Sequence, residues 1–331
     1  MKNASSSDSY LVRPFQAGDE WPINAEFNRI FGKQRTMAEW NWKYGKNSEQ
    51  SLIYILSDAD DNILAHYGGR RMRLWANNQE IAAGHITDSF AKRIGPVVRG
   101  QWFNKLRSAF FDEFGNDQCW PVIYGFPGER AKRQALHAHS HEEHYPITRW
   151  HLDTNLLDHH VKKQWKTSHG HLLQSQADQL WMRSKARYEF CVVRDGRWLD
   201  WRFHQHPNSE KYHLFWVKKS GLWPSSVKAW AVFCENDGDW LCVDLLWDGH
   251  HEDALDALFG AAASKLRPTS GLFQLWADAD ADLAAYLNGR SSSKMIWEDG
   301  PQYSCRCFSP NLKSVLNPAA FYRTAADLDI V

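Results

Sequence analysis

Hydrophobic residues between positions 11 and 152 follow two different spacings. Apolar or alternating segments at 51–57, 63–75 and 81–90 are separated by short polar turns, a pattern typical of an antiparallel meander. From Phe103 to Phe114 the apolar residues recur in steps of three and four, as they do on one face of a helix. The remaining elements predicted for this half are strands at 11–15, 121–126 and 145–152 and helices at 25–31 and 129–139.

The same order of elements recurs between residues 188 and 310. The predicted elements there are strands at 188–193, 212–218, 227–233 and 240–247, a helix at 252–266, a strand at 272–276, a helix at 280–288, and strands at 294–297 and 303–308. The polar region between the halves is rich in His and Gln. The pattern therefore favours a mixed α/β class with two units, 1–155 and 188–331, joined by a connector at 156–187.

Two short sequence matches link the halves. Residues 39–44 and 197–203 both end in Trp, a cation and an aromatic ring, with Trp42 and Trp201 separated by 159 residues. Residues 86–90 and 242–246 match at an offset of 156. Two matches at nearly one offset, together with the repeated order of elements, predict a duplicated domain. Coincidence in a Trp-rich chain is the alternative.

Charge and hydropathy exclude several classes of protein. The chain has 331 residues, with 39 Lys+Arg balanced by 39 Asp+Glu. A neutral chain lacks the basic surplus of a non-specific nucleic-acid binder or a polybasic membrane-surface protein. No apolar run approaches the length of about 20 residues that a membrane helix needs, and residues 1–10 lack the apolar core of a signal peptide. We therefore expect a cytoplasmic protein with neither nucleic acid nor membrane as a partner. The oligomeric state stays open.

Cysteine, histidine and tryptophan usage adds little chemistry. The six Cys include no C-x-x-C, so neither a disulfide scaffold nor a Cys metal site is expected. A His-rich run, 137–144, falls where a helix is predicted to end, and the other paired histidines, among them His171 and His204, are interpreted as solvated polar residues. We expect no metal. The 18 Trp either fill the core or line a ligand groove, and composition does not separate these two interpretations.

The turn between the third strand of the meander and the following helix is a candidate phosphate site. The free N–H groups and the positive end of the helix dipole attract anions, and Gly95 allows close approach of a ligand. Lys92 and Arg93 add positive charge. On local features alone an ordinary strand–helix turn is the favoured interpretation, because one glycine is weak evidence for a phosphate site.

The order of elements and several motifs resemble the GNAT (Gcn5-related N-acetyltransferase) superfamily, in its bacterial tandem form. Residues 12–15 followed by Gly18-Asp19 resemble the usual opening of that family. Lys-Arg-Ile-Gly-Pro-Val at 92–97 resembles its acetyl-CoA loop, and Tyr-Gly-Phe-Pro at 124–127 resembles the strand that follows. The resemblance covers residues 11–152, whereas 188–310 match only in the order of elements.

This resemblance implies a fold and a coenzyme. It predicts two tandem GNAT-like domains, the first of which binds acetyl-CoA as acyl donor. Two positions depart from the family pattern: Val97 stands where Gly or Ala is usual, and Ala135 lies near the place of a common Tyr acid. The resemblance assigns the following residues to coenzyme binding: Phe90, Ala91, Lys92, Arg93, Ile94, Gly95, Pro96, Val97 and Val98.

Candidate catalytic groups lie on the strands that flank this loop. Asp88 is the first candidate for the base that takes the proton of an attacking amine, with a structural carboxylate as the alternative. His85 is its rival, expected on the opposite face of the same strand. Tyr124 and Tyr145 are candidate acids for the departing thiolate.

The second half is predicted to have lost coenzyme binding. At the equivalent turn, Glu252 and Asp253 stand where a pyrophosphate would lie, and each carboxylate would repel it by about 1 kcal/mol in water at a separation of about 4 Å. The leading hypothesis is therefore an N-acetyltransferase with one working and one degenerate domain, acting on an amine of a small molecule or peptide. The alternatives are a non-catalytic acyl-CoA-binding or scaffold protein and an aminoacyl transferase of the FemABX type, which would need tRNA.

Overall fold

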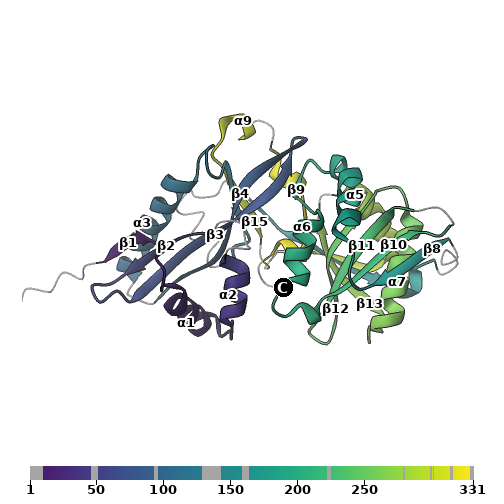
Figure 1. Cartoon of the computed structure of the whole chain (residues 1–331), viewed down its shortest axis with the longest axis horizontal. Coiled ribbons are helices and arrows are strands. Elements are labelled where there is room, and N and C mark those ends of the chain that lie inside the picture. The colour runs from purple at the N-terminus through teal and green to yellow at the C-terminus, as the bar shows by residue number, and fades with distance from the viewer. Residues whose placement is uncertain are drawn as a thin grey trace, which may run out of the picture.

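The computed structural model describes residues 10–45, 51–92, 96–128, 143–158, 164–221, 225–278, 280–298, 300, 302–313 and 316–328. Two halves lie end to end and share one continuous mixed sheet (Figure 1). This arrangement confirms the prediction of a mixed α/β fold with two related units. Within the residues given above, no helix has the length and apolar character that crossing a membrane would require.

The first half is a twisted sheet between helices. Its elements are β1 (Leu11–Pro14), α1 (Glu20–Phe31), α2 (Met37–Tyr44), β2 (Ser51–Ser57), β3 (Ile63–Ala76), β4 (Gln79–Ala91), α3 (Pro96–Phe114), β5 (Val122–Gly125), β6 (Glu143–Tyr145) and β7 (Ile147–Asp153). Asn77 and Asn78 both have positive φ, as the tightest hairpin between two right-twisted strands requires. Helix α2 was not predicted, although Thr36 and Glu39 form a capping box at its start.

The second half repeats this order. Its elements are β8 (Trp165–His169), α5 (Gln174–Ser184), β9 (Phe190–Val192), α6 (Gly196–Leu199), a π-helical turn (Asp200–His204), β10 (His213–Lys219), β11 (Val227–Asn236), β12 (Asp239–Trp247), α7 (Glu252–Leu266), β13 (Leu272–Asp278), α8 (Ala281–Arg290), β14 (Ser291–Trp297), β15 (Tyr303–Cys307), α9 (Pro310–Lys313) and β16 (Phe321–Thr324). The strands β10, β11 and β12 form a meander like that of β2, β3 and β4.

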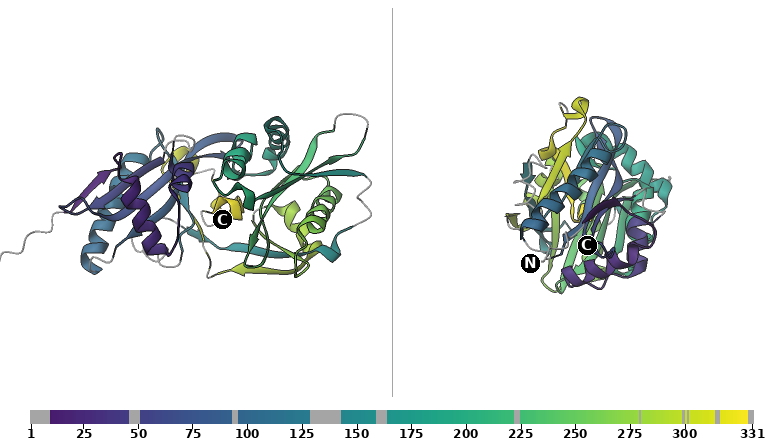
Figure 2. Two further views of the ribbon diagram at one scale, coloured as in Figure 1. Left: turned by 60° about the horizontal axis from the view of Figure 1, so that its bottom comes forward. Right: turned by 90° about the vertical axis from the view of Figure 1, so that its left-hand side faces the viewer.

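The two halves exchange strands. β7 of the first half pairs with β13 and β14 of the second, and β15 of the second half pairs with β5 and β6 of the first. In the second view, β7 and β14 run together beneath the second half (Figure 2, left). Each sheet is therefore complete only when the other half supplies a strand.

Two segments behave differently from the sequence prediction. The expected connector, 156–187, contains β8, which is the edge strand beside β10. The strand expected at 188–193 does not open the second half, because β9 pairs with β3 of the first half and with β16. The division of the chain into units at residues 155 and 188 stays a prediction, since strands cross it in both directions.

Helix α3 covers one face of the first sheet. Phe110 and Leu106 are fully buried there, and Trp120 lies over Gly69 and Gly84. A side chain at Gly84 would place its Cβ 2.1 Å from the Trp120 ring, so this close approach requires glycine. Helices α1 and α2 cover the other face, where Ile23, Trp40 and Phe90 form a separate apolar cluster. The polar residues described next lie on this second face.

Candidate active site

A β-bulge in β4 brings three polar side chains onto one face of the sheet. Two residues of β4, Asp88 and Ser89, lie opposite the single residue Tyr67 of β3. Asp88 has φ +54°. Tyr44 bonds to both Thr87 and Asp88, so these neighbours point the same way. Asp88 therefore shares the α2-covered face with His85, and the prediction that they lie on opposite faces is wrong. The extra residue reverses the alternation on which that prediction depended.

Asp88 is buried within a set of ionic contacts. Its carboxylate is paired with the guanidinium of Arg35 and lies 2.7 Å from the Lys43 ammonium, and the Tyr44 hydroxyl donates to it at 2.7 Å. Burial alone would raise the pKa of Asp88, but the charges of Lys43 and Arg35 outweigh it and hold that pKa well below its ordinary value. The carboxylate therefore stays ionised and is a weak proton acceptor. Its predicted role as a base stays a prediction.

Arg70, His85 and Tyr124 lie side by side on β3, β4 and β5. The His85 ring stacks on the Tyr124 ring with centroids 4.7 Å apart, and His85 Nδ1 lies 3.3 Å from an Arg70 guanidinium nitrogen. Because a guanidinium only donates, Nδ1 must accept, and the proton of a neutral His85 is then on Nε2. Among the described residues, His85 Nε2 and the Tyr124 hydroxyl have no hydrogen-bond partner.

The environment of Arg70, His85 and Tyr124 keeps the His85 and Tyr124 side chains neutral. His85 is 1% exposed, and burial, together with the charges of Arg70 and Lys43, holds its pKa well below its ordinary value. Burial likewise raises the pKa of Tyr124. At neutral pH the row therefore presents an N–H and an O–H, both of which can donate. Tyr145, the other predicted acid, lies on β6 against Tyr303, with ring centroids 6.1 Å apart.

The strands β4 and β5 part just beyond this row. Their parallel pairing ends at Ile86 and Gly125, whereas β4 continues to Ala91. No other described strand pairs with Thr87–Ala91 on that side, so the described part of the chain leaves the edge of β4 open there. An open edge offers backbone N–H and C=O groups to an extended ligand.

The predicted coenzyme segment is described only in part. Phe90 is buried and stacks on His66, and the Lys92 ammonium lies 2.9 Å from Glu26 of α1. Helix α3 begins at Pro96, within the segment 92–97 that the sequence predicted as a loop. Arg93, Ile94 and Gly95 lie outside the described residues, as do Ala135 and the His-rich run up to residue 142, and the side chains at 96–99 are not described.

In the second half the corresponding space between strands is filled. The parallel pairing of β12 with β13 ends at Cys242 and Leu275, and β16 pairs with the end of β13. Tyr322 and Thr324 of β16 bond to Leu245 and Asp244 of β12. β16 thus occupies the place that the described residues leave open in the first half.

A buried ionic cluster anchors that segment. Arg194, which is not exposed at all, lies between Asp244 and Asp327 at 3.0 and 2.5 Å. Burial raises the pKa of Asp244 to about 6 despite the nearby guanidinium. The predicted obstacles, Glu252 and Asp253, form the first turn of α7, where Asp253 accepts a hydrogen bond from Trp165.

The two halves meet at their matching Trp segments. Trp42 and Trp201 stack with ring centroids 5.1 Å apart, and each indole N–H points at the other's backbone carbonyl, at 2.8 and 3.4 Å. The Arg70 guanidinium lies over the Trp201 ring. The sequence match therefore marked a contact, but Arg35, Lys43 and Tyr44 were not predicted as site residues. The matched segment 39–44 contained a signal for the last two.

Comparisons with known proteins identify the fold. No protein-family model matches the sequence, and a search of curated proteins found no match. Among solved structures, the chain is similar to a conserved protein of unknown function from Enterococcus faecalis V583, described as a probable N-acyltransferase, with TM-score 0.67 and 13% identity over 91% of this chain and 72% of that one. It is also similar to a GCN5-related N-acetyltransferase from Kribbella flavida, with TM-score 0.64 and 11% identity over 91% and 71% of the two chains.

A third similarity concerns the tandem arrangement. A tandem GNAT protein from the clavulanic acid biosynthesis pathway matches with TM-score 0.53 and 8% identity, over 91% of this chain and 99% of that one. It agrees with the repeated order of elements. The chain therefore has the fold of the GCN5-related N-acetyltransferase superfamily, present twice in tandem.

Proposed function

We propose that this protein is an acyl-CoA-dependent N-acyltransferase that transfers an acetyl group from acetyl-CoA to an amine of a small molecule or peptide. The observation that carries the proposal is the edge of β4 beyond Ile86 and Gly125. It lies beside two buried donors that have no hydrogen-bond partner among the described residues. The corresponding space in the second half is filled by β16, which supports a single working site.

The reaction proposed is a direct transfer. The amine nitrogen attacks the thioester carbonyl carbon to form a C–N bond, and the carbonyl oxygen takes up negative charge. Collapse of this intermediate breaks the C–S bond and releases the coenzyme as a thiolate, which takes a proton, while the amine loses one. Hydrogen-bond donors aimed at the developing oxyanion are the largest source of rate in such reactions.

We assign Tyr124 and His85 donor roles in this step. Tyr124 keeps its proton at neutral pH because burial raises its pKa, so it can donate a hydrogen bond to the departing thiolate. His85 presents Nε2–H because Arg70 occupies Nδ1, which suits it to stabilise the oxyanion better than to accept a proton. Asp88 would act by holding the bulge through Arg35, Lys43 and Tyr44.

Two substitutions of His85 distinguish a donor from a base. Gln keeps an N–H near the Nε2 position but cannot act as a base, whereas Leu removes both functions. We expect His85→Gln to retain most of kcat with acetyl-CoA and a panel of amines, and His85→Leu to lower kcat about 10²–10³-fold. If both lower kcat equally, His85 is a base and the donor assignment is wrong.

The same assay tests the alternative functions. Release of free coenzyme thiol that depends on an amine supports the acyltransferase. Saturable acetyl-CoA binding without turnover on any amine would support the non-catalytic acyl-CoA-binding protein instead. If acetyl-CoA does not bind at all, the proposal fails.

A second experiment tests the coenzyme segment. Gly95→Asp places a carboxylate in the loop proposed to hold the pyrophosphate, and we expect calorimetry to show at least about tenfold weaker acetyl-CoA binding. Gly221→Asp is the matched control, because it adds the same charge at an exposed position of the second half with open space around it. Equal affinity of Gly95→Asp and wild type would contradict the assignment.

A further inference from the structure

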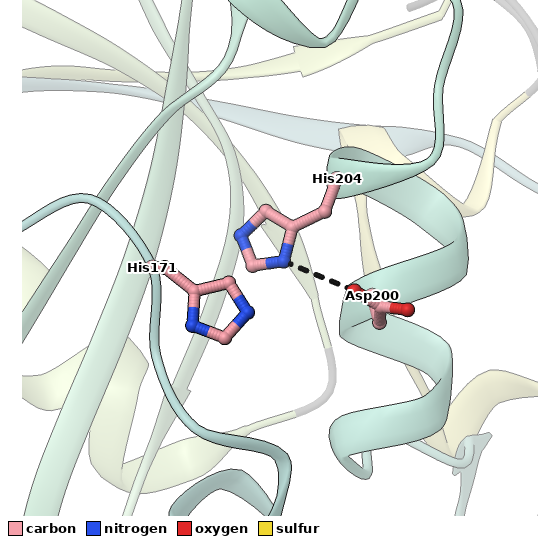
Figure 3. Close-up of side chains that lie close together, drawn as sticks. All are labelled: His171, Asp200 and His204. Carbon is pink, nitrogen blue, oxygen red and sulfur yellow. Dashed lines mark hydrogen bonds and ion pairs between the residues drawn. The ribbon is translucent and has the colours of Figure 1, made fainter.

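We propose that His171, Asp200 and His204 form a binding site for one divalent transition-metal ion, with zinc as the best-fitting candidate. One ligand atom from each of the three residues lies within 4.8 Å of the others. They come from two elements, the segment after β8 and the π-helical turn, and their side chains converge on one point (Figure 3). This inference is independent of the acyl-transfer proposal.

The spacing suits a small ion with four ligands. His204 Nδ1 and Asp200 Oδ1 are 3.3 Å apart, and two ligands at about 2.1 Å from a tetrahedral zinc ion are about 3.4 Å apart. The His171 and His204 rings face each other with centroids 4.7 Å apart. A modest rotation of His171, which is exposed at the surface, is enough to bring its nitrogen to the same ion.

The backbone of the π-helical turn positions two of the three ligands, Asp200 and His204. Asp200 and His204 are one turn apart on the π-helical turn, whose end is fixed by the bond from Gln205 N–H to the Asp200 carbonyl at 2.9 Å. π-Helical turns occur frequently at functional sites. The Gln205 side chain donates to Asp200 Oδ2 at 2.6 Å, which orients the carboxylate and leaves Oδ1 toward the histidines. Such outer contacts are typical of metal sites.

The donor set selects the class of ion. Two imidazoles and one carboxylate favour zinc and its first-row neighbours over magnesium and calcium, which prefer oxygen ligands. Three protein ligands leave a fourth position for water or a small anion. The same turn carries Trp201, which stacks on Trp42, so a bound ion would fix the element through which the halves meet. The interpretation of His171 and His204 as merely solvated residues missed this convergence, because they are distant in sequence.

Calorimetry with zinc chloride on the full chain, stripped beforehand with a chelator, tests the proposal. We expect one zinc ion per chain, no heat with magnesium, and a rise in Tm on adding zinc, because an ion that binds only the native state stabilises it. His171→Gln and His204→Gln should each weaken zinc binding at least about tenfold. His250→Gln is the matched control, since His250 is also exposed and belongs to no such group among the described residues.

A further variant separates this site from the His-rich run in the sequence. The double variant His139→Gln/His141→Gln should leave the single zinc site intact. If His171→Gln binds zinc like wild type, or if the double variant loses the ion, the proposed site is wrong. Circular dichroism of each variant checks that the fold is kept, and His171 is suited to this because it is exposed.

Discussion

At the scale of single residues, Asp88 and Asp61 can be compared with each other. Both have positive φ, +54° and +61°, and both are paired with an arginine. Asp88 is nearly inaccessible, with 3% of its side chain exposed, whereas Asp61 is 70% exposed. Because both have a similar positive φ but opposite burial, the contribution of a buried ion pair to stability can be compared with that of an exposed one within one chain.

We expect Asp88→Asn to lower the free energy of unfolding by about 3–5 kcal/mol, because it removes the carboxylate between the buried cations Arg35 and Lys43. Asp61→Asn should lower it by less than about 1 kcal/mol, as at exposed pairs. Urea unfolding measures both. A stable Asp88→Asn variant with kcat reduced about 10²–10⁴-fold would instead support the role of Asp88 as a base.

Acid should destabilise the protein through two buried histidines and a half-buried one. Burial lowers the pKa of His66 and of His206 to about 4, and that of His85 well below its ordinary value. As pH falls below about 6.5, the unfolded chain takes up these protons and the folded chain does not. Asp244, whose pKa is raised to about 6, opposes this by taking up one proton when folded.

These three histidines, less Asp244, leave about two more protons on the unfolded chain, and the lowered pKa values of His169, His204 and His213 act in the same direction. We therefore expect the free energy of unfolding to fall by at least roughly 3 kcal/mol per pH unit between about pH 6 and pH 4. Urea titrations at a series of pH values measure the slope. His85→Gln should reduce it by about 1.4 kcal/mol per pH unit. A stability that does not change over this interval would show that these histidines are not buried as neutral groups.

At the scale of elements, the packing of α3 on the sheet depends on glycine. Gly84 lies directly under Trp120, whereas Gly100, within α3, has no atom near the position of a Cβ. We expect Gly84→Ala to lower the free energy of unfolding by about 1–3 kcal/mol through overpacking. Gly100→Ala should raise it by up to about 1 kcal/mol, because alanine favours the helix. If urea unfolding gives both changes the same sign, the packing described for Trp120 is wrong.

The contact between α2 and the π-helical turn can be measured by a double-mutant cycle. Trp42→Phe and Trp201→Phe each remove an indole N–H and part of the stacked area. We expect a coupling energy of about 0.5–1.5 kcal/mol in urea unfolding. Trp42→Phe with Trp216→Phe on β10 is the control pair, which should be additive within about 0.5 kcal/mol. Additivity in both pairs would contradict the stacking.

Local patterns predicted most of these elements, and the misses have physical causes. The meander, α3 and α7 carry strong hydrophobic spacing, so their positions are confirmed within a few residues. The faces of β4 beyond Thr87 were not predictable, because one bulged residue reverses the alternation. The ionic contacts of Asp88 depend on Arg35, 53 residues away, and spacing within a segment carries no information about such a pairing.

At the scale of the whole molecule, neither half is complete alone. β5 needs β15 beside it, and β13 needs β7. We expect a fragment of residues 1–158, expressed alone, to show no cooperative unfolding transition, and co-expression with 164–331 to restore one complex. Size-exclusion chromatography and circular dichroism check this outcome. A cooperative transition in the isolated first fragment would contradict it.

The exchange of strands between the halves could not be predicted from local sequence patterns, for a related reason. β7 and β15 were predicted as strands at nearly their observed positions, but the choice between two similar sheets is made by tertiary packing. Duplicated units have similar edges, so each strand fits either partner by local criteria. The sequence therefore predicted the repeat, and the partner of each closing strand emerged only from the complete fold.

The exchange also places a condition on synthesis of the chain at the ribosome. β15 follows β5 by about 180 residues, which at typical translation rates is on the order of 10–40 s. Throughout that interval the nascent first half exposes the edge of β5, and unpaired edges recruit other chains. A protein built in this way needs its edge shielded until β15 emerges, so slower elongation over the second half should increase its aggregation rather than help it fold.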